Sequence, residues 1–275
     1  MRRLSIIALG VTFILIFCGS NAISGWQQKI GKEVVFVEKD SSGQKYGYIL
    51  IYREPNIIGN RLPYKDFVGK KGKLIGVVKD KLGVAFFWEI QLETGQMAYA
   101  QKLEGFDDQI DDLYFVDDYN EAKKKIGKFI WVNQNEWKQP LLTENKDLSY
   151  PLEDFEKVKV IDVFTKLLGH AYGGAPFYLK VQKNTGEIGY IGYQHNNYFD
   201  ENPIDPTWDK SIIEAIKQHK ITIGMTNDQV QLSWGKPKKV NRTVTSQGVR
   251  EQWIYSKEKY LYLDNNKLTA IQEEL

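Results

Sequence analysis

An internal repeat constrains the fold of this 275-residue chain more than any other feature of its sequence. The tripeptide Ile-Gly-Lys at residues 30–32 returns at residues 126–128, each time before a run of β-branched and aromatic residues. Three further landmarks return in the same order, at residues 62–67 and 150–155, 73–78 and 158–163, and 87–96 and 178–187. Four landmarks in one order predict two copies of one small unit, with insertions in the loops.

Each copy reads as about five short strands, because its apolar runs are short and rich in β-branched and aromatic residues. Gly95 and Gly186 follow Thr94 and Thr185 at predicted hairpin turns, where glycine can adopt a positive φ. The predicted fold class is therefore mainly β, with one small β-barrel at residues 26–103 and a second at residues 123–200. By strand pattern and shared landmarks, the copies resemble bacterial Src-homology-3-like barrels. That resemblance implies a binding role, since some exported members of the class bind cell-wall peptides.

An acidic segment separates the two predicted barrels. Residues 104–122 contain six aspartates, and we expect them to form a solvated acidic linker or the N-terminal turn of a helix. The alternative is a calcium site, but a calcium-binding EF-hand loop that began at Asp107 would have Asp112 where glycine is required and Asp118 where glutamate is required.

The last 68 residues, 208–275, follow two prolines, Pro203 and Pro206, and predict a separate α+β module. Asp209 is a predicted cap of a first amphipathic helix. Thr226 and Gln229 form a predicted capping box for a second helix, which should end at Gly235. Alternating apolar residues then predict three strands, which gives the order ααβββ, and a fourth strand is the alternative.

Several short motifs make this module similar to the SmpA/OmlA family of BamE-like proteins. They lie at residues 223–226, 229–230, 234–237, 251–255, 260–263 and 266–268. The resemblance covers roughly residues 220–272, and it implies an ααβββ fold with a binding or scaffolding role and no chemistry of its own. The family includes a lipoprotein of the outer-membrane β-barrel assembly machinery. This chain departs from the family pattern in two ways: two predicted barrels precede the module, and the lipidation motif that ends at Cys18, near the N-terminus, is imperfect.

The N-terminus indicates export. Arg2 and Arg3 precede an apolar run over residues 4–17, and small residues lead up to a cleavage site after Ala22, as in a secretory signal peptide over residues 1–22. The alternatives are a buried N-terminal helix and lipidation at Cys18, although Phe17 departs from the lipidation motif. We expect a periplasmic or cell-envelope protein, or an outer-membrane-anchored lipoprotein if Cys18 is acylated. A membrane contact is expected only through the signal peptide or that lipid anchor.

Composition excludes several classes of function. The chain has 37 basic and 35 acidic residues, and loss of Arg2 and Arg3 would leave 35 of each, which argues against a nucleic-acid partner. Cys18 is the only cysteine, so disulfides and cysteine nucleophiles are not expected in the processed chain. No nucleophile, phosphate-binding or zinc motif is present, and we expect no cofactor and no metal.

Aromatic residues of the second copy are the candidate ligand site. Tyr172, Tyr190, Tyr193, His195 and Tyr198 could line a shallow groove on barrel loops, or the tyrosines could fill the edges of the core. The sequence thus predicts an exported, non-catalytic binding or scaffold protein that contacts an envelope protein or peptidoglycan. The alternatives are a secreted inhibitor of an envelope hydrolase, an outer-membrane assembly-type lipoprotein and an enzyme that uses carboxylates alone.

Overall fold

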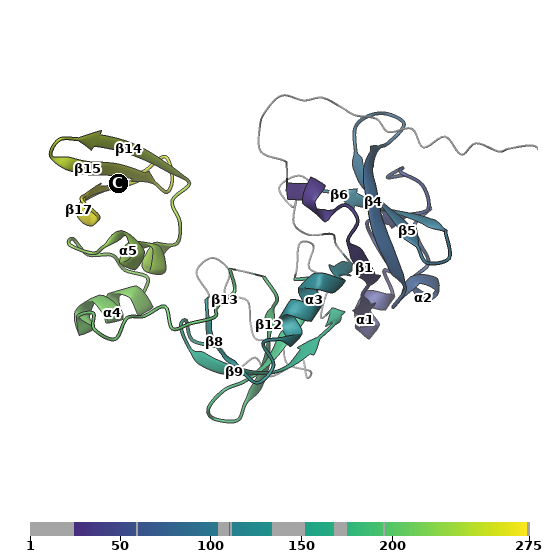
Figure 1. Cartoon of the computed structure of the whole chain (residues 1–275), viewed down its shortest axis with the longest axis horizontal. Helices are drawn as coiled ribbons and strands as arrows, with labels where there is room; N and C mark the ends of the chain where they lie inside the picture. Colours follow the sequence, from purple (N-terminus) through teal and green to yellow (C-terminus); the bar gives the residue numbers. More distant parts are fainter. Residues whose placement is uncertain are drawn as a thin grey trace, which may run out of the picture.

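The computed structural model describes residues 25–58, 60–103, 110, 112–133, 152–167, 175–194 and 196–273. In these ranges the protein is mainly β, as predicted, with curled antiparallel sheets that form a half-barrel. A six-stranded, a five-stranded and a four-stranded sheet follow one another along an open arc (Figure 1). The predicted signal peptide and Cys18 lie outside the described residues. Among the described helices, none is both long and apolar enough to cross a membrane.

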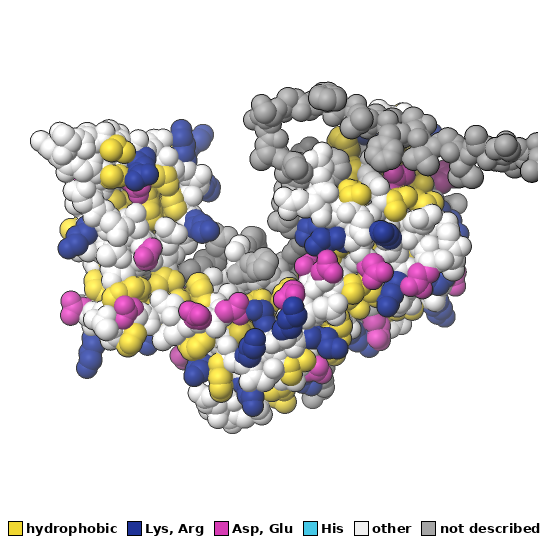
Figure 2. Space-filling view, in the orientation of Figure 1, with side chains coloured by type: hydrophobic (Ala, Val, Ile, Leu, Met, Phe, Trp, Pro, Cys, Tyr) yellow, Lys and Arg dark blue, Asp and Glu magenta, His cyan; other side chains and the backbone are white. Residues whose placement is uncertain are grey.

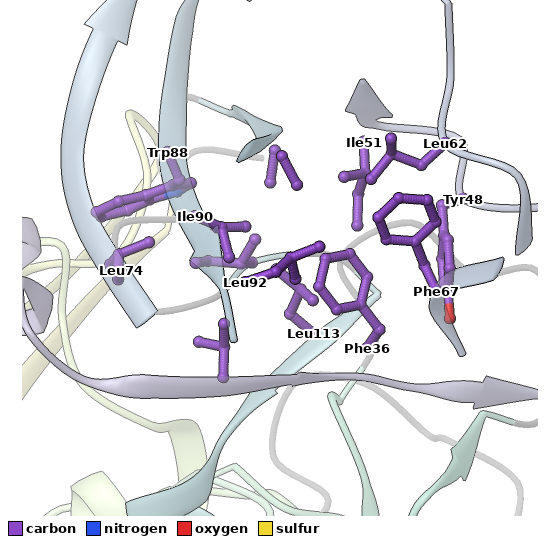
Figure 3. Close-up of a cluster of buried hydrophobic side chains, with 14 of the residues drawn as sticks. Phe36, Tyr48, Ile51, Leu62, Phe67, Leu74, Trp88, Ile90, Leu92 and Leu113 are labelled. Atoms are coloured by element: carbon purple, nitrogen blue, oxygen red, sulfur yellow. The ribbon is translucent and has the colours of Figure 1, made fainter. Parts of the chain in front are cut away.

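The first sheet has the strand order β3-β6-β5-β4-β1-β7. Its strands are β1 (Glu33–Phe36), β3 (Ile51–Tyr52), β4 (Lys71–Lys79), β5 (Phe86–Leu92), β6 (Met97–Lys102) and β7 (Leu113–Phe115). Short elements between and before them are η1 (Gly25–Lys29), β2 (Glu38–Lys39), α1 (Ser41–Gln44) and α2 (Tyr64–Phe67). The curled sheet closes over a core in which Phe36 meets Tyr48 edge to face at 5.6 Å, with Trp88 and Leu74 at the other end (Figure 3).

The second sheet has the strand order β12-β11-β9-β8-β13. Its strands are β8 (Phe129–Val132), β9 (Lys157–Phe164), β11 (Tyr178–Gln182), β12 (Ile188–Gly192) and β13 (Tyr198–Phe199). The helix α3 (Val116–Lys123) connects the first sheet to the second and contributes Ala122 to the second core. The two-residue strand β10 (Lys166–Leu167) leaves this sheet and pairs in parallel with β2 of the first unit.

The sequence repeat is also a structural repeat. The order β6-β5-β4-β1-β7 in the first sheet corresponds to β12-β11-β9-β8-β13 in the second, so five strands of each unit occupy matching places. An irregularity is shared as well. Ile75 is the extra residue where β4 pairs with β5, and Ile161 is the extra residue where β9 pairs with β11. Such bulges bend a strand, so both sheets bend at the equivalent position.

The shared Ile-Gly-Lys motif has a local structural reason. Gly31 has φ +88° and donates its N–H to the carbonyl of Leu74 at 2.7 Å. Gly127 has φ +85° and donates in the same way to Val160 at 2.8 Å. Residues with a side chain rarely adopt this backbone conformation, so the motif needs glycine to turn the chain into its first strand.

The acidic segment is more structured than the sequence predicts. Leu113–Phe115 form β7, which pairs with β1, and Val116–Lys123 form α3. The second half of the segment is thus no plain linker, because it completes the first sheet and starts the connection to the second. The alternative of a helix N-terminal turn is confirmed for Asp117 and Asp118, which lie in the first turn of α3. Residues 104–109 and 111 lie outside the described part of the chain.

The C-terminal unit carries two helices on one face of a four-stranded sheet of order β14-β15-β16-β17. Its elements are α4 (Lys210–Lys217), α5 (Asn227–Trp234), β14 (Lys239–Thr245), β15 (Gly248–Ile254), β16 (Lys259–Asp264) and β17 (Lys267–Glu273). The possible fourth strand is thus present. The capping box of Thr226 and Gln229 is confirmed, and α5 ends at Gly235 as predicted. Asp209 occupies the N-cap of α4 but makes no side-chain capping bond.

Candidate functional site

The predicted tyrosine groove is divided between different places. Tyr190 is buried in a small cluster with Ala175 and Tyr178, where its ring lies 4.9 Å from that of Phe164. Tyr193 and Tyr198 pack instead against the main core of the second sheet. Tyr172 and His195 lie outside the described residues. The groove of five residues therefore stays a prediction, and the described members do not form one cluster.

Tyr193 and Tyr198 belong to an aromatic cluster whose other members the sequence did not indicate. The Tyr193 ring stacks on Phe177 at 4.7 Å and lies 6.1 Å from Tyr198. Tyr114 of β7 and Tyr119 of α3 meet Phe177 edge to face at 5.8 and 6.0 Å. Both tyrosines come from the acidic segment at residues 104–122, which the sequence does not indicate as a source of aromatic site residues. The cluster joins α3 to the second sheet.

Burial changes the pKa values of the tyrosines in this cluster. Burial raises the pKa of Tyr114 and of Tyr193 above the ordinary value, and it raises the pKa of Tyr198 further. The hydroxyls of Tyr193 and Tyr198 also share a hydrogen bond. These phenols therefore stay protonated at neutral pH. Packing of α3 accounts for the contacts of these rings.

The described carboxylates and imidazoles do not gather into a metal site. Among the residues that the structure describes, no group of three His, Cys, Asp or Glu side chains could hold a metal ion. His219 contacts both units. Its Nε2 lies 3.6 Å from Asp154 Oδ2 of the second unit, and its Nδ1 lies 3.1 Å from the Ser233 carbonyl of the C-terminal unit. These contacts place His219 at the joint between the second unit and the C-terminal unit.

The most accessible regular element is the outer strand of the C-terminal sheet. All seven residues of β14 are exposed, and in the described sheet β14 pairs only with β15. Val240 and Val244 are 44% and 69% exposed. An edge strand offers unpaired backbone N–H and C=O groups, which another extended chain can use.

This edge is also basic. Residues 235–250 contain Lys236, Lys238, Lys239, Arg242 and Arg250 and no aspartate or glutamate. The three lysines are exposed, and Arg242 makes a partly exposed ion pair with Glu251 of β15 at 3.5 Å. Figure 2 shows Lys and Arg side chains on the lobe of the surface that carries β14 and β15 in Figure 1. The edge therefore favours acidic over basic partners.

The sheet face opposite the helices is polar. Trp253 and Leu261 point to the helices and are buried, so their strand neighbours Gln252 and Tyr262 point the other way. Hydrogen bonds cross all four strands on this face. Asn241 Nδ2 donates to Gln252 at 3.0 Å, Gln252 Nε2 donates to the Tyr262 hydroxyl at 3.2 Å, and that hydroxyl donates to Gln272 at 2.7 Å. This ladder links all four strands on the polar face.

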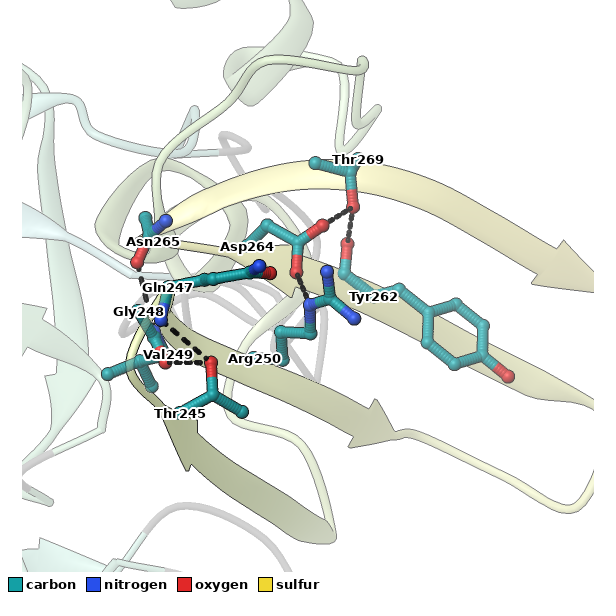
Figure 4. Close-up of polar contacts among 9 residues, drawn as sticks. All are labelled: Thr245, Gln247, Gly248, Val249, Arg250, Tyr262, Asp264, Asn265 and Thr269. Carbon is teal, nitrogen blue, oxygen red and sulfur yellow. Dashed lines mark hydrogen bonds and ion pairs between the residues drawn. The ribbon is translucent and has the colours of Figure 1, made fainter.

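Polar contacts also fix the end of the sheet where β14 turns into β15 (Figure 4). The Arg250 guanidinium lies 3.3 Å from the Asp264 carboxylate, and the Val249 N–H donates to the Asn265 side chain at 3.0 Å. Gly248 has φ +128°, and a Cβ added there would lie 2.0 Å from Asn265 Oδ1. The hairpin that carries β14 is thereby held against β16 and its turn.

Comparison with known proteins gives no family for this chain: no family model matches it, and no curated protein matches it significantly.

Proposed function

We propose that this chain is an exported, non-catalytic binding protein of the bacterial cell envelope, whose C-terminal unit holds an extended acidic segment of a partner protein. The observation that supports this most is the edge strand β14, which is exposed along its whole length and flanked by lysines. The N-terminal pattern of residues 1–22 supports export.

The proposal also includes a fold type for each of the three units. We assign the two repeated sheets to Src-homology-3-like barrels and the C-terminal unit to the SmpA/OmlA type. The shared strand order of the two units supports the first assignment, and two helices followed by an antiparallel meander support the second. Both types use surfaces rather than reactive centres, in agreement with a binding role.

Binding at β14 follows from two properties of the strand. Its open edge can form a ladder of backbone hydrogen bonds with an incoming strand, which gives affinity without dependence on sequence. The positive charge of Lys236, Lys238 and Lys239 then selects acidic segments, since opposite charges speed encounter and like charges penalise the wrong partner.

The test is affinity capture from envelope extract with the processed protein, in parallel with sedimentation on purified peptidoglycan. We expect capture of a discrete partner protein, a loss of that partner in the Lys236→Glu/Lys238→Glu/Lys239→Glu variant, and no retention on peptidoglycan. The matched control changes three exposed lysines of the first two units, Lys65, Lys71 and Lys128, to glutamate. Capture that both triple variants weaken equally, or retention on peptidoglycan alone, contradicts the proposal. A captured hydrolase that loses activity on mixing supports the inhibitor alternative instead.

A further inference from the structure

The hairpin tip between β4 and β5 exposes apolar side chains. Leu82 is 79% exposed and Val84 is 75% exposed, and Phe86, where β5 begins, is 44% exposed. Tight turns in soluble proteins usually carry Gly, Asn, Asp, Ser or Pro, because these residues suit both the backbone and the water. A cluster of exposed apolar side chains indicates an interaction surface.

The tip is a fixed structure that holds these side chains in water. The Asp80 N–H donates to the Ala85 carbonyl at 2.9 Å, and the Gly83 N–H donates to the Asp80 carbonyl at 3.0 Å. One carboxylate oxygen of Asp80 accepts the Val84 N–H at 2.7 Å, and the Asp80 side chain is buried beneath the turn. Gly83 adopts φ +71°, which a residue with a side chain rarely does. The loop is therefore preorganised with Leu82 and Val84 outward.

Positive charge flanks the apolar tip. Lys79 and Lys81 are exposed, and the Lys79 Nζ lies 5.0 Å from the centre of the Phe86 ring. Lys79 and Lys102 are the cross-strand neighbours of Phe86 on β4 and β6. Asp80 is the only acidic residue in residues 79–86, and it is the one that accepts the Val84 N–H. The apolar side chains of the tip are thus flanked by positive charge, from Lys81 in the turn and Lys79 at its base.

We infer that this hairpin tip, defined as residues 79–86, inserts into the surface of an anionic lipid bilayer. Leu82 and Val84 enter the boundary between headgroups and acyl chains, and Phe86 lies at headgroup level. Lys79 and Lys81 remain among the phosphates, where the negative surface potential attracts them. Lys79 lies opposite Phe86 at the base of the hairpin, and Lys81 lies in the turn beside Leu82, so ammonium groups flank the apolar side chains where phosphates would meet them. This contact goes beyond the proposed function and beyond the membrane contacts expected of a signal peptide or a lipid anchor, and it involves the first unit instead of the C-terminal one.

The experiment is co-sedimentation with vesicles of phosphatidylethanolamine and phosphatidylglycerol, and with neutral phosphatidylcholine vesicles. Every protein carries Cys18→Ala, so that no acyl chain contributes, and all share one N-terminus. We expect binding to the anionic vesicles and a loss of about tenfold or more in affinity for Leu82→Ser/Val84→Ser, since two apolar side chains leave the lipid. Lys79→Gln/Lys81→Gln should weaken binding to anionic vesicles and leave any binding to neutral vesicles unchanged.

The control is Ile57→Ser/Ile58→Ser, which removes two other exposed aliphatic side chains, of 44% and 85% exposure, from the loop after β3. It should bind anionic vesicles as the parent does, and near-ultraviolet circular dichroism should show that all variants are folded. Three results overturn the inference: no binding of the parent to anionic vesicles, equal binding by Leu82→Ser/Val84→Ser and the parent, and equal loss in the control. Loss of protein capture at β14 has no bearing on these measurements, so the two proposals fail separately.

Discussion

The Lys39 ammonium lies 2.6 Å from the Asp112 carboxylate, and the two side chains are only 8% and 10% exposed. Lys39 Nζ also donates to the Gly47 carbonyl at 2.7 Å, and the Asp112 carbonyl accepts the Val37 N–H at 3.0 Å. Burial raises the pKa of Asp112 above its ordinary value even though Lys39 opposes that shift. The pair fastens the segment before β7 to β2, the strand that also pairs with β10 of the second unit.

Loss of Asp112 should therefore destabilise the first unit strongly. Asp112→Ala leaves the Lys39 ammonium buried without its carboxylate, which we expect to cost about 3 kcal/mol. The apolar replacement Lys39→Met/Asp112→Leu should cost less than Asp112→Ala alone, because no charge is then buried. Urea denaturation measures both. Asp117→Ala, which removes a carboxylate of 66% exposure, is the control and should change the free energy of unfolding by less than about 1 kcal/mol. Equal effects of Asp112→Ala and Asp117→Ala would show that the pair has no such role.

The glycines of the repeated motif should be equivalent. Gly127→Ala meets no atom within 4 Å, and Gly31→Ala only approaches the end of Lys73, so the cost is that of a positive φ alone. We expect each substitution to destabilise its own unit by about 1–2 kcal/mol. Thermal unfolding checks this, with the exposed Lys128→Ala as control. A neutral effect at either glycine would contradict the equivalence of the two copies.

Local signals in the sequence predicted the local structure well. The capping box at Thr226 and the positive φ of Gly95 and Gly186 depend on neighbouring residues, and all are confirmed. The runs at residues 73–78 and 158–163, and those that begin at residues 87 and 178, also became matching strands, because their apolar residues are buried on one face.

Non-local pairing explains what the sequence did not reveal. Leu113–Phe115 become a strand because β1 supplies the partner. The aspartates on both sides of this short apolar run made the sequence typical of a solvated segment instead of a strand. Asp112 is buried only because Lys39 meets it there. Tyr190 and Tyr193 are three positions apart, and the structure packs them into different clusters. The open edge of β14 likewise depends on the strand order of the sheet.

Stability at alkaline pH should depend on Tyr255. Its hydroxyl donates to the Gly235 carbonyl at 2.9 Å, and burial raises its pKa above the ordinary value of 10.0. The unfolded chain therefore ionises first, so this contribution to stability is complete below about pH 10 and is lost as the pH rises through the folded-state pKa. One such group gives a slope of at most about 1.4 kcal/mol per pH unit.

Tyr255→Phe tests this dependence. The variant should lose about 1 kcal/mol at neutral pH with the hydrogen bond, and its stability should fall less steeply than that of the parent above pH 10. Urea denaturation between pH 7 and about pH 11 measures both quantities. Parallel pH profiles for the two proteins would contradict the assignment.

The joint between the second unit and the C-terminal unit should depend on Phe155. This side chain comes from the loop before β9, is 8% exposed, and packs in the C-terminal core with Ile216 and Trp253. Its ring also stacks on Phe199 at 6.1 Å. Phe155→Ala should leave a cavity that costs about 3 kcal/mol locally. Hydrogen exchange should then accelerate in α4 and α5 and remain unchanged in the first sheet.

Phe129→Ala is the matched control, since Phe129 also belongs to the second unit but is 42% exposed and lies outside that core. It should not change exchange in α4 or α5. If both substitutions accelerate exchange there to the same extent, Phe155 has no special role at the joint.

The most direct test of binding at β14 is site-specific photo-crosslinking in intact cells. A photoreactive residue replaces Val244 on β14 or, as the control, Ile188 on β12, which are 69% and 43% exposed. The account predicts a discrete protein adduct at position 244 that disappears when Lys236, Lys238 and Lys239 are changed to glutamate, and no such adduct at position 188. The absence of an adduct at position 244, or the same adduct at both positions, would contradict it.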